Sequence, residues 1–128
     1  MRPCLLIKGK DVMKNRPFYV RMNFALNGIK ACWRSESSFR AHVGWAAAAI
    51  VIMFVIRPSA TWWALMGVAI TSVMAFELLN SALERLIDHL HPDIHPEIGI
   101  VKDMASGAVL LTGVGAFVIA VSLLSSLF

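Results

Sequence analysis

Five polar side chains recur along one stretch of an otherwise apolar segment. In FELLNSALERLID, residues 76–88, they occupy positions i, i+3, i+4, i+7 and i+11: Glu77, Asn80, Ser81, Glu84 and Asp88. On an α-helix with about 3.6 residues per turn, these positions lie along one side. A carboxylate inside an apolar, membrane-crossing helix is costly, so it indicates a functional site.

Two further polar clusters stand immediately before other apolar segments. Glu36 precedes one of them, and Lys102 with Asp103 precedes another. If the apolar segments cross a membrane, all three clusters lie at one depth. Carboxylates from several helices are suitable ligands for Mg²⁺, and a lysine is a point charge for phosphate. A carboxylate can also take a proton from a hydroxyl, so the set suits phosphoryl transfer.

The elements that must position these residues are three apolar segments, at about 41–56, 60–83 and 104–128. The chain is 58% hydrophobic and 16% charged, whereas a soluble domain has about half and a quarter. A membrane helix needs about 20 residues. The first segment becomes long enough when it includes residues 37–40, because Arg40 can snorkel. A soluble three-helix bundle would need a polar face on each helix, and the third segment has no charge.

The distribution of basic residues predicts the topology. Nine of the 12 Lys and Arg residues precede the first span, and the connection to the second span carries only Arg57. The N-terminus is therefore expected on the cytoplasmic side of the membrane and the C-terminus on the outer side. This placement also argues against nucleic acid as a partner, despite the net charge of +4.

The segment at 16–35 has a different pattern. Its apolar residues recur at spacings of three and four: Phe18, Met22, Ala25, Ile29 and Trp33. This predicts an amphipathic helix at the cytoplasmic membrane surface. Residues 1–15 show no pattern and are expected to form a mobile N-terminal extension.

The predicted fold is therefore an all-α membrane protein with three transmembrane helices and an N-terminal amphipathic surface helix. One domain is expected at 16–128, with spans at about 37–56, 60–88 and 101–127. Cys4 and Cys32 have no metal or redox spacing and are expected to be free thiols. There is no G-x-x-x-x-G-K-[ST] and no D-F-G, so ATP would bind without either common kinase scaffold.

The polar motifs resemble a known signature. ELLNSALE at 77–84, followed by Asp88 and by VKDMAS at 101–106, resembles E-[IL]-L-N-[ST]-A-[IL]-E…D…K-D-[MV] of the bacterial integral-membrane diacylglycerol kinases. The resemblance extends from about residue 24 to the C-terminus. Matching residues upstream are Gly28, Ile29, Lys30, Ala31, Trp33, Glu36, Phe39 and Arg40. Undecaprenol kinases share the fold and core motif, but KDMASGAVLL looks more like the Gram-negative diacylglycerol kinase branch.

The resemblance implies roles for individual residues. Glu77 matches the general base that acts on the lipid hydroxyl, and Glu36 and Glu84 match carboxylates that hold Mg²⁺ with ATP. The implied nucleotide-binding residues are Glu36, Asn80, Glu84, Asp93, His95, Lys102 and Asp103. The implied lipid-substrate residues are Lys30, Phe39, Arg40, Glu77 and Ser106.

The resemblance also implies a homotrimer whose active sites are shared between neighbouring subunits. Small residues in the third span would allow close helix approach; they are Ala105, Gly107, Ala108, Gly113, Gly115 and Ala116. The chain departs from the family pattern at two positions. His42 stands where the family often has an acidic residue, and Pro17 stands where it tends to have an arginine.

The expected function is ATP- and Mg²⁺-dependent phosphorylation of diacylglycerol to phosphatidic acid. An undecaprenol kinase with the same site is the nearest alternative. A small transporter or proton channel would use Glu77 as a carrier, but it predicts polar groups near the bilayer midplane and across both leaflets. A non-catalytic membrane scaffold predicts no ATP turnover.

Overall fold

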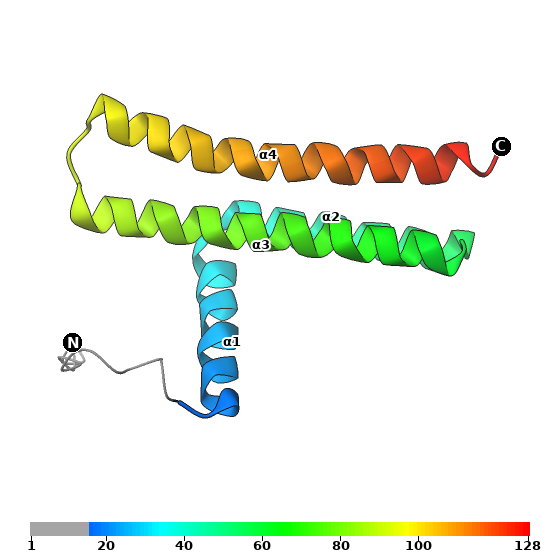
Figure 1. Ribbon diagram of the computed structural model, residues 1–128, viewed down its shortest axis with the longest axis horizontal. Coiled ribbons are helices and arrows are strands. Elements are labelled where there is room, and N and C mark those ends of the chain that lie inside the picture. Colours follow the sequence, from blue (N-terminus) through cyan, green and yellow to red (C-terminus); the bar gives the residue numbers. More distant parts are fainter. Residues whose placement is uncertain (1–15) are drawn as a thin grey trace.

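The chain forms four helices in a computed structural model that describes residues 16–128 (Figure 1). They are α1 (Phe18–Ser35), α2 (Ser37–Ile56), α3 (Ala60–Leu90) and α4 (Pro96–Ser125). Helices α2, α3 and α4 are long and apolar enough to cross a membrane, which confirms the three predicted membrane helices. The extension predicted for residues 1–15 lies outside the described residues.

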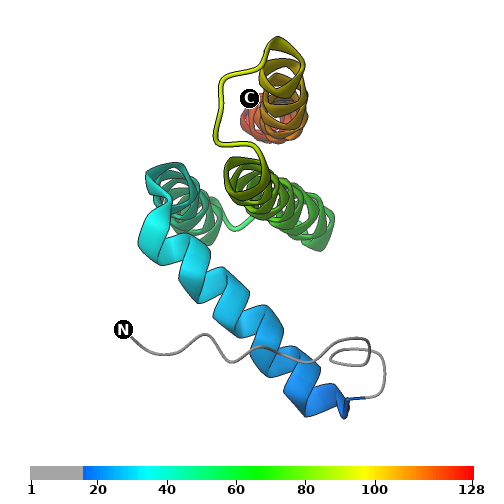
Figure 2. The same cartoon turned by 90° about the vertical axis from the view of Figure 1, so that its left-hand side faces the viewer.

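The three long helices are arranged around α3. Helix α4 packs mainly on α3, and α2 packs on another side of α3, as the end-on view in Figure 2 shows. Between α2 and α4 lies an apolar groove of about 380 Å³ whose lining includes Trp45, Met66 and Phe117. Helix α1 runs roughly at right angles to the long helices (Figure 1), and only Glu36 separates it from α2.

Local sequence explains the two connections between the long helices. Helix α2 ends at Ile56, and its C-cap Arg57 has a left-handed backbone (φ 54°, ψ 53°) and donates its N–H to the Met53 carbonyl at 2.9 Å. Pro58 follows and disfavours continuation of the helix. Helix α4 begins at Pro96, a residue suited to the first helical position. It therefore starts ahead of the membrane span predicted from about residue 101.

The hydrophobic core lies toward the end of the bundle that carries the α2–α3 turn. Met53, Met66 and Leu123, one from each long helix, are buried together, and Trp62 and Trp63 pack against them. The ring of Trp63 also meets Phe54 edge-on, with centroids 4.9 Å apart. Aromatic pairs of this geometry add to the stabilisation that burial provides.

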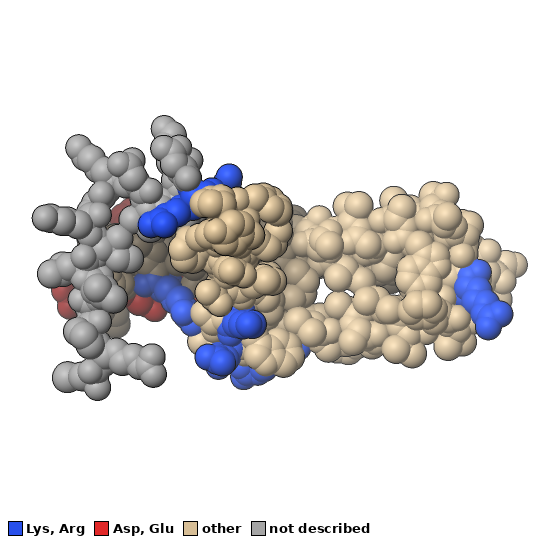
Figure 3. Space-filling model, turned by 90° about the horizontal axis from the view of Figure 1, so that it is seen from below, with Lys and Arg blue, Asp and Glu red and all other residues tan. Residues whose placement is uncertain are grey.

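The charged residues gather at the opposite end. In Figure 3 the blue and red side chains cluster around α1 and the adjoining end of the long helices, and an uncharged surface separates them from a second blue patch at the far end. The turn at the far end contributes Arg57. Apart from Arg57, the end of the bundle at the α2–α3 turn is therefore apolar among the described residues, and the end near α1 is polar.

Candidate functional site

Glu77 is buried, and it is the first of the five polar residues that recur along one side of α3. Its exposed fraction is 3%, and it lies in the middle of α3. The Ser38 hydroxyl of α2 donates a hydrogen bond to Oε1 of Glu77. Nε2 of His42, one turn further along α2, lies 3.9 Å from Oε2. Two side chains of α2 thus face the two oxygens of a carboxylate that would otherwise be buried without partners.

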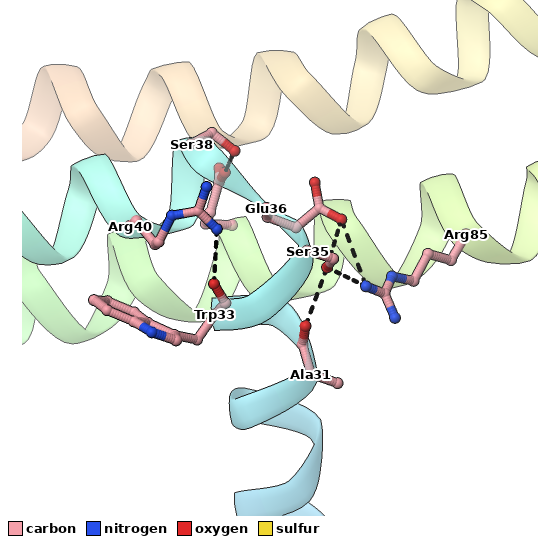
Figure 4. Close-up of polar contacts among 8 residues, drawn as sticks. Ala31, Trp33, Ser35, Glu36, Ser38, Arg40 and Arg85 are labelled. Carbon is pink, nitrogen blue, oxygen red and sulfur yellow. Dashed lines mark hydrogen bonds and ion pairs between the residues drawn. The ribbon is translucent and has the colours of Figure 1, made fainter.

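Glu36 lies at the corner between α1 and α2, within a small polar network (Figure 4). Its Oε1 is 3.7 Å from Nη2 of Arg85 on α3. The Ser35 hydroxyl donates to the same oxygen at 3.0 Å and receives a hydrogen bond from Arg85. Arg40 also stabilises the corner, because its Nη1 donates to the Trp33 carbonyl at 2.9 Å. The network holds Glu36 against α3.

Asn80 and Glu84 lie on the same side of α3 as Glu77. Together with Ser81 and Asp88, these residues form the polar stripe of α3. Nδ2 of Asn80 donates to Oε1 of Glu84 at 3.1 Å. Oδ1 of Asn80 is buried and has no hydrogen-bond partner among the described residues. Because buried polar atoms are nearly always paired, this oxygen is available to a ligand.

These oxygens suit the Mg²⁺ ion that the sequence predicts. Mg²⁺ binds through one or two carboxylates, and waters and substrate phosphates complete its shell. Glu36, Glu84 and the unpaired Oδ1 of Asn80 are donors of that kind. Within residues 16–128, no three His, Cys, Asp or Glu side chains gather into a complete metal site. No hydrogen bond or ion pair among the described residues joins Glu36 to Asn80 or Glu84.

The remaining predicted nucleotide residues lie near the α3–α4 connection. Lys102 donates a hydrogen bond to Oδ1 of Asp88 in a solvent-exposed ion pair. His95 caps α4, because its Nδ1 accepts the Glu97 backbone N–H at 3.3 Å. Asp93 and Asp103 are exposed. No hydrogen bond or ion pair among the described residues joins these four side chains to Glu77, Asn80 or Glu84.

An open groove lies between α1, α2 and α3, and Glu77 is not among its lining residues. It has a volume of about 730 Å³ and is lined by residues of three helices: Ile29, Lys30, Trp33, Arg34, Phe39, Val43, Met74, Ala75 and Leu78. The residues of α3 in this list stand on either side of Glu77 in the sequence. Of the predicted lipid residues, Lys30 and Phe39 line the groove, whereas the exposed Ser106 lies on α4 in another groove that it shares with His42.

Comparison with known proteins identifies the family. The family model described as prokaryotic diacylglycerol kinase matches residues 23–124. The chain belongs to this family. The diacylglycerol kinase of Escherichia coli strain K12 is 33% identical over 88 residues, which are 69% of this chain and 72% of the relative. The undecaprenol kinase of Bacillus subtilis strain 168 is 31% identical over 97 residues, 76% and 79% of the two chains.

A third relative, the diacylglycerol kinase of Helicobacter pylori strain J99, is 32% identical over 88 residues, 69% of each chain. Membership of the prokaryotic diacylglycerol kinase family shows that the protein is a lipid kinase with helices able to span a membrane. The family therefore argues against both the carrier and the scaffold interpretations of Glu77.

Three residues that contact the candidate site were not among the predicted site residues: Ser38, His42 and Arg85. Arg85 belongs to the same helix as the stripe, but its position predicts no contact with Glu36. Ser38 and His42 are polar positions four residues apart at the start of an apolar helix. That spacing places both on one face of α2 and is the signal that could have identified them.

Proposed function

We propose that the protein transfers the γ-phosphoryl group of ATP to the hydroxyl of diacylglycerol, giving phosphatidic acid and ADP, with Mg²⁺ as the cofactor. The observation that carries the proposal is the buried Glu77 carboxylate, which Ser38 holds on α3, the helix that also forms one wall of an open apolar groove. A positioned carboxylate can act as a general base on a hydroxyl.

Glu77 takes the proton from the lipid hydroxyl as the oxygen attacks the γ-phosphorus. The groove receives the apolar part of the lipid, and Lys30 and Phe39 contact it there. Arg40 fixes the corner between α1 and α2 that forms one wall. Ser106 is assigned to the lipid from the α4 side.

Other residues, on and off the polar stripe, are assigned to binding the metal ion and the nucleotide phosphates. Glu36 and Glu84 would hold Mg²⁺, which offsets charge on the nucleotide phosphates when bound. The unpaired Oδ1 of Asn80 supports this assignment. Lys102 is available for phosphate, because an exposed ion pair such as that with Asp88 contributes only about 0–1 kcal/mol. Asp93, His95 and Asp103 complete the proposed nucleotide contacts.

The placement in the membrane follows from the charge distribution. The polar end, with α1, is assigned to the cytoplasmic side of the inner membrane and the C-terminus to the periplasm. Because α1 is roughly perpendicular to the membrane helices (Figure 1), it would lie along the bilayer surface. Its exposed apolar side chains, such as Phe18, Met22 and Trp33, support this position. Residues 16–128 then form one kinase domain.

We also propose that the active protein is a homotrimer with shared active sites. A Cβ added at Gly107, Gly113 or Gly115 would meet no atom within 4 Å, so packing within one chain does not require these glycines. Small residues on membrane helices permit close approach of another helix. A neighbouring subunit could also supply the ligands that one chain lacks.

Undecaprenol is the second candidate substrate, because a relative named undecaprenol kinase aligns with 76% of the chain. The test is a purified-enzyme assay in mixed micelles with labelled ATP, in which diacylglycerol and undecaprenol are offered separately and together. We expect labelled phosphatidic acid, abolished when EDTA removes Mg²⁺. Faster turnover of undecaprenol would transfer the proposal to that lipid, and turnover of neither would overturn it.

A further inference from the structure

The burial of Glu77 limits the routes by which this carboxylate can lose a proton. Each phosphoryl transfer by the proposed mechanism leaves one proton on this carboxylate. The side chain of Glu77 is only 4% exposed, so bulk water does not reach it freely. A base in this position needs a neighbouring group that removes the proton before the next cycle.

The two oxygens of Glu77 have different surroundings. Oε1 accepts the hydrogen bond from the Ser38 hydroxyl. Oε2 faces Nε2 of His42 at 3.9 Å, a separation that a small side-chain rotation or one bridging water would close. Imidazole is the side chain that most readily gains and loses a proton near neutral pH. The His42 side chain is 33% exposed, so it connects the buried carboxylate with the surface.

No other titratable group is recorded against His42 in the described part of the chain. The residues of α4 that share a groove with it are Ser106, Val109, Leu110, Gly113, Val114 and Phe117. The second groove beside it is lined by apolar residues of α2, α3 and α4. Within residues 16–128, the carboxylate that lies against the imidazole is that of Glu77 on α3.

We propose that Ser38 and His42 are positioning and proton-relay residues for Glu77, an inference that rests on the proposed function. Ser38 fixes Oε1, so Oε2 is the atom that takes the proton when the lipid O–H bond breaks. The lipid oxygen then bonds to the γ-phosphorus, and the bond to ADP breaks. The proton moves from Oε2 of Glu77 to Nε2 of His42, and His42 then releases it to water.

The test compares His42→Ala, Ser38→Ala and Ser38→Thr in the full-length protein, with Ser37→Ala as the control on the neighbouring exposed serine. His42→Ala should lower kcat by roughly tenfold or more with little change in KM for MgATP. Added imidazole should restore its turnover, with a pH profile that follows protonation of free imidazole, and should not restore Ser38→Ala. Ser38→Thr keeps a hydroxyl and should retain most of the activity that Ser38→Ala loses.

The wild-type assay separates the two levels of the proposal. If the wild type phosphorylates a lipid with MgATP but His42→Ala keeps the wild-type kcat, the relay is wrong and the proposed function stands. Loss of activity that imidazole fails to rescue, together with a lower melting temperature in micelles, would give His42 a structural role and overturn the relay. A wild type without lipid kinase activity would overturn both.

Discussion

The two ends of the helix bundle use the same helices for different purposes. At the α2–α3 turn, Met53, Met66 and Leu123 are buried against one another. At the other end the buried residues of α3 are Glu77 and Ser81, with Ser38 and His42 of α2 facing the carboxylate. One end joins the helices through apolar packing, and the other brings together groups that can do chemistry.

The difference predicts that stability and catalysis can be changed separately along the length of one helix. Helix α3 contributes Met66 to the core and Glu77 to the site. Because packing energies fall off within a few ångströms, substitutions at one end should leave the properties of the other end intact. Four substitutions test this separation, from the largest expected effect to the smallest.

Glu77→Gln keeps the shape of the side chain and removes the base. We expect turnover to fall by about 10²–10⁴-fold, whereas nucleotide binding and the melting temperature change little. Steady-state kinetics in mixed micelles and calorimetric titration with MgATP measure these quantities, and Glu97→Gln, an exposed carboxylate on α4, is the control. Normal turnover in Glu77→Gln would show that the general-base role is wrong.

Met53→Ala tests the opposite end of the bundle, because it changes the apolar core and leaves the candidate site intact. Met53 is 1% exposed, and removing a buried methionine leaves a cavity that costs about 2 kcal/mol or more. We expect lower resistance to thermal unfolding in detergent and unchanged kcat per folded molecule. Val55→Ala, on the exposed side of α2, should change little. An equal loss of kcat at constant folded fraction would break the separation between the two ends.

Glu84→Ala should weaken the metal and nucleotide side of the site. It removes one proposed ligand and leaves the Nδ2 group of Asn80 without its acceptor. We expect turnover to need more Mg²⁺, with affinity for MgATP reduced about 10–100-fold. A titration of rate against Mg²⁺, with Glu97→Ala as the control, measures the effect. An unchanged Mg²⁺ dependence would argue against the role of Glu84.

Arg85→Gln should have the smallest effect, and in the opposite direction. Arg85 neutralises part of the charge of Glu36, and an exposed ion pair of this kind contributes about 0.2–1 kcal/mol. Its removal should lower the Mg²⁺ concentration for half-maximal rate by up to about fivefold. Arg21→Gln, an exposed residue of α1, is the control. A raised Mg²⁺ requirement would indicate that Arg85 itself binds phosphate.

The sequence predicted the three long apolar helices because hydrophobic length and composition are local properties. It also predicted the family, because the E-x-x-N-x-x-x-E and K-D motifs are contiguous. Both predictions are confirmed. The start of α4 at Pro96 differs from the predicted span, because hydropathy marks the apolar segment and the cap at His95 marks the helix.

The contacts between helices could not be predicted in the same way. The hydrogen bond from Ser38 to Glu77 and the ion pair between Arg85 and Glu36 join positions far apart in the chain. Helical periodicity gives the face on which a residue lies, but not the residue that faces it on another helix. The departure at His42 therefore became interpretable only when α2 was placed against α3. The roles of the site residues and the trimer remain predictions.

The left-handed residue at Arg57 has a consequence for the opposite end of the molecule. This turn is short and its backbone is fixed by a hydrogen bond to Met53. It therefore determines which face of α2 is turned toward α3. One residue inserted within α2 would rotate the Ser38–His42 face by about 100° and shift it by about 1.5 Å. The number of residues in α2 therefore determines whether the Ser38 hydroxyl and the His42 imidazole lie opposite the Glu77 carboxylate.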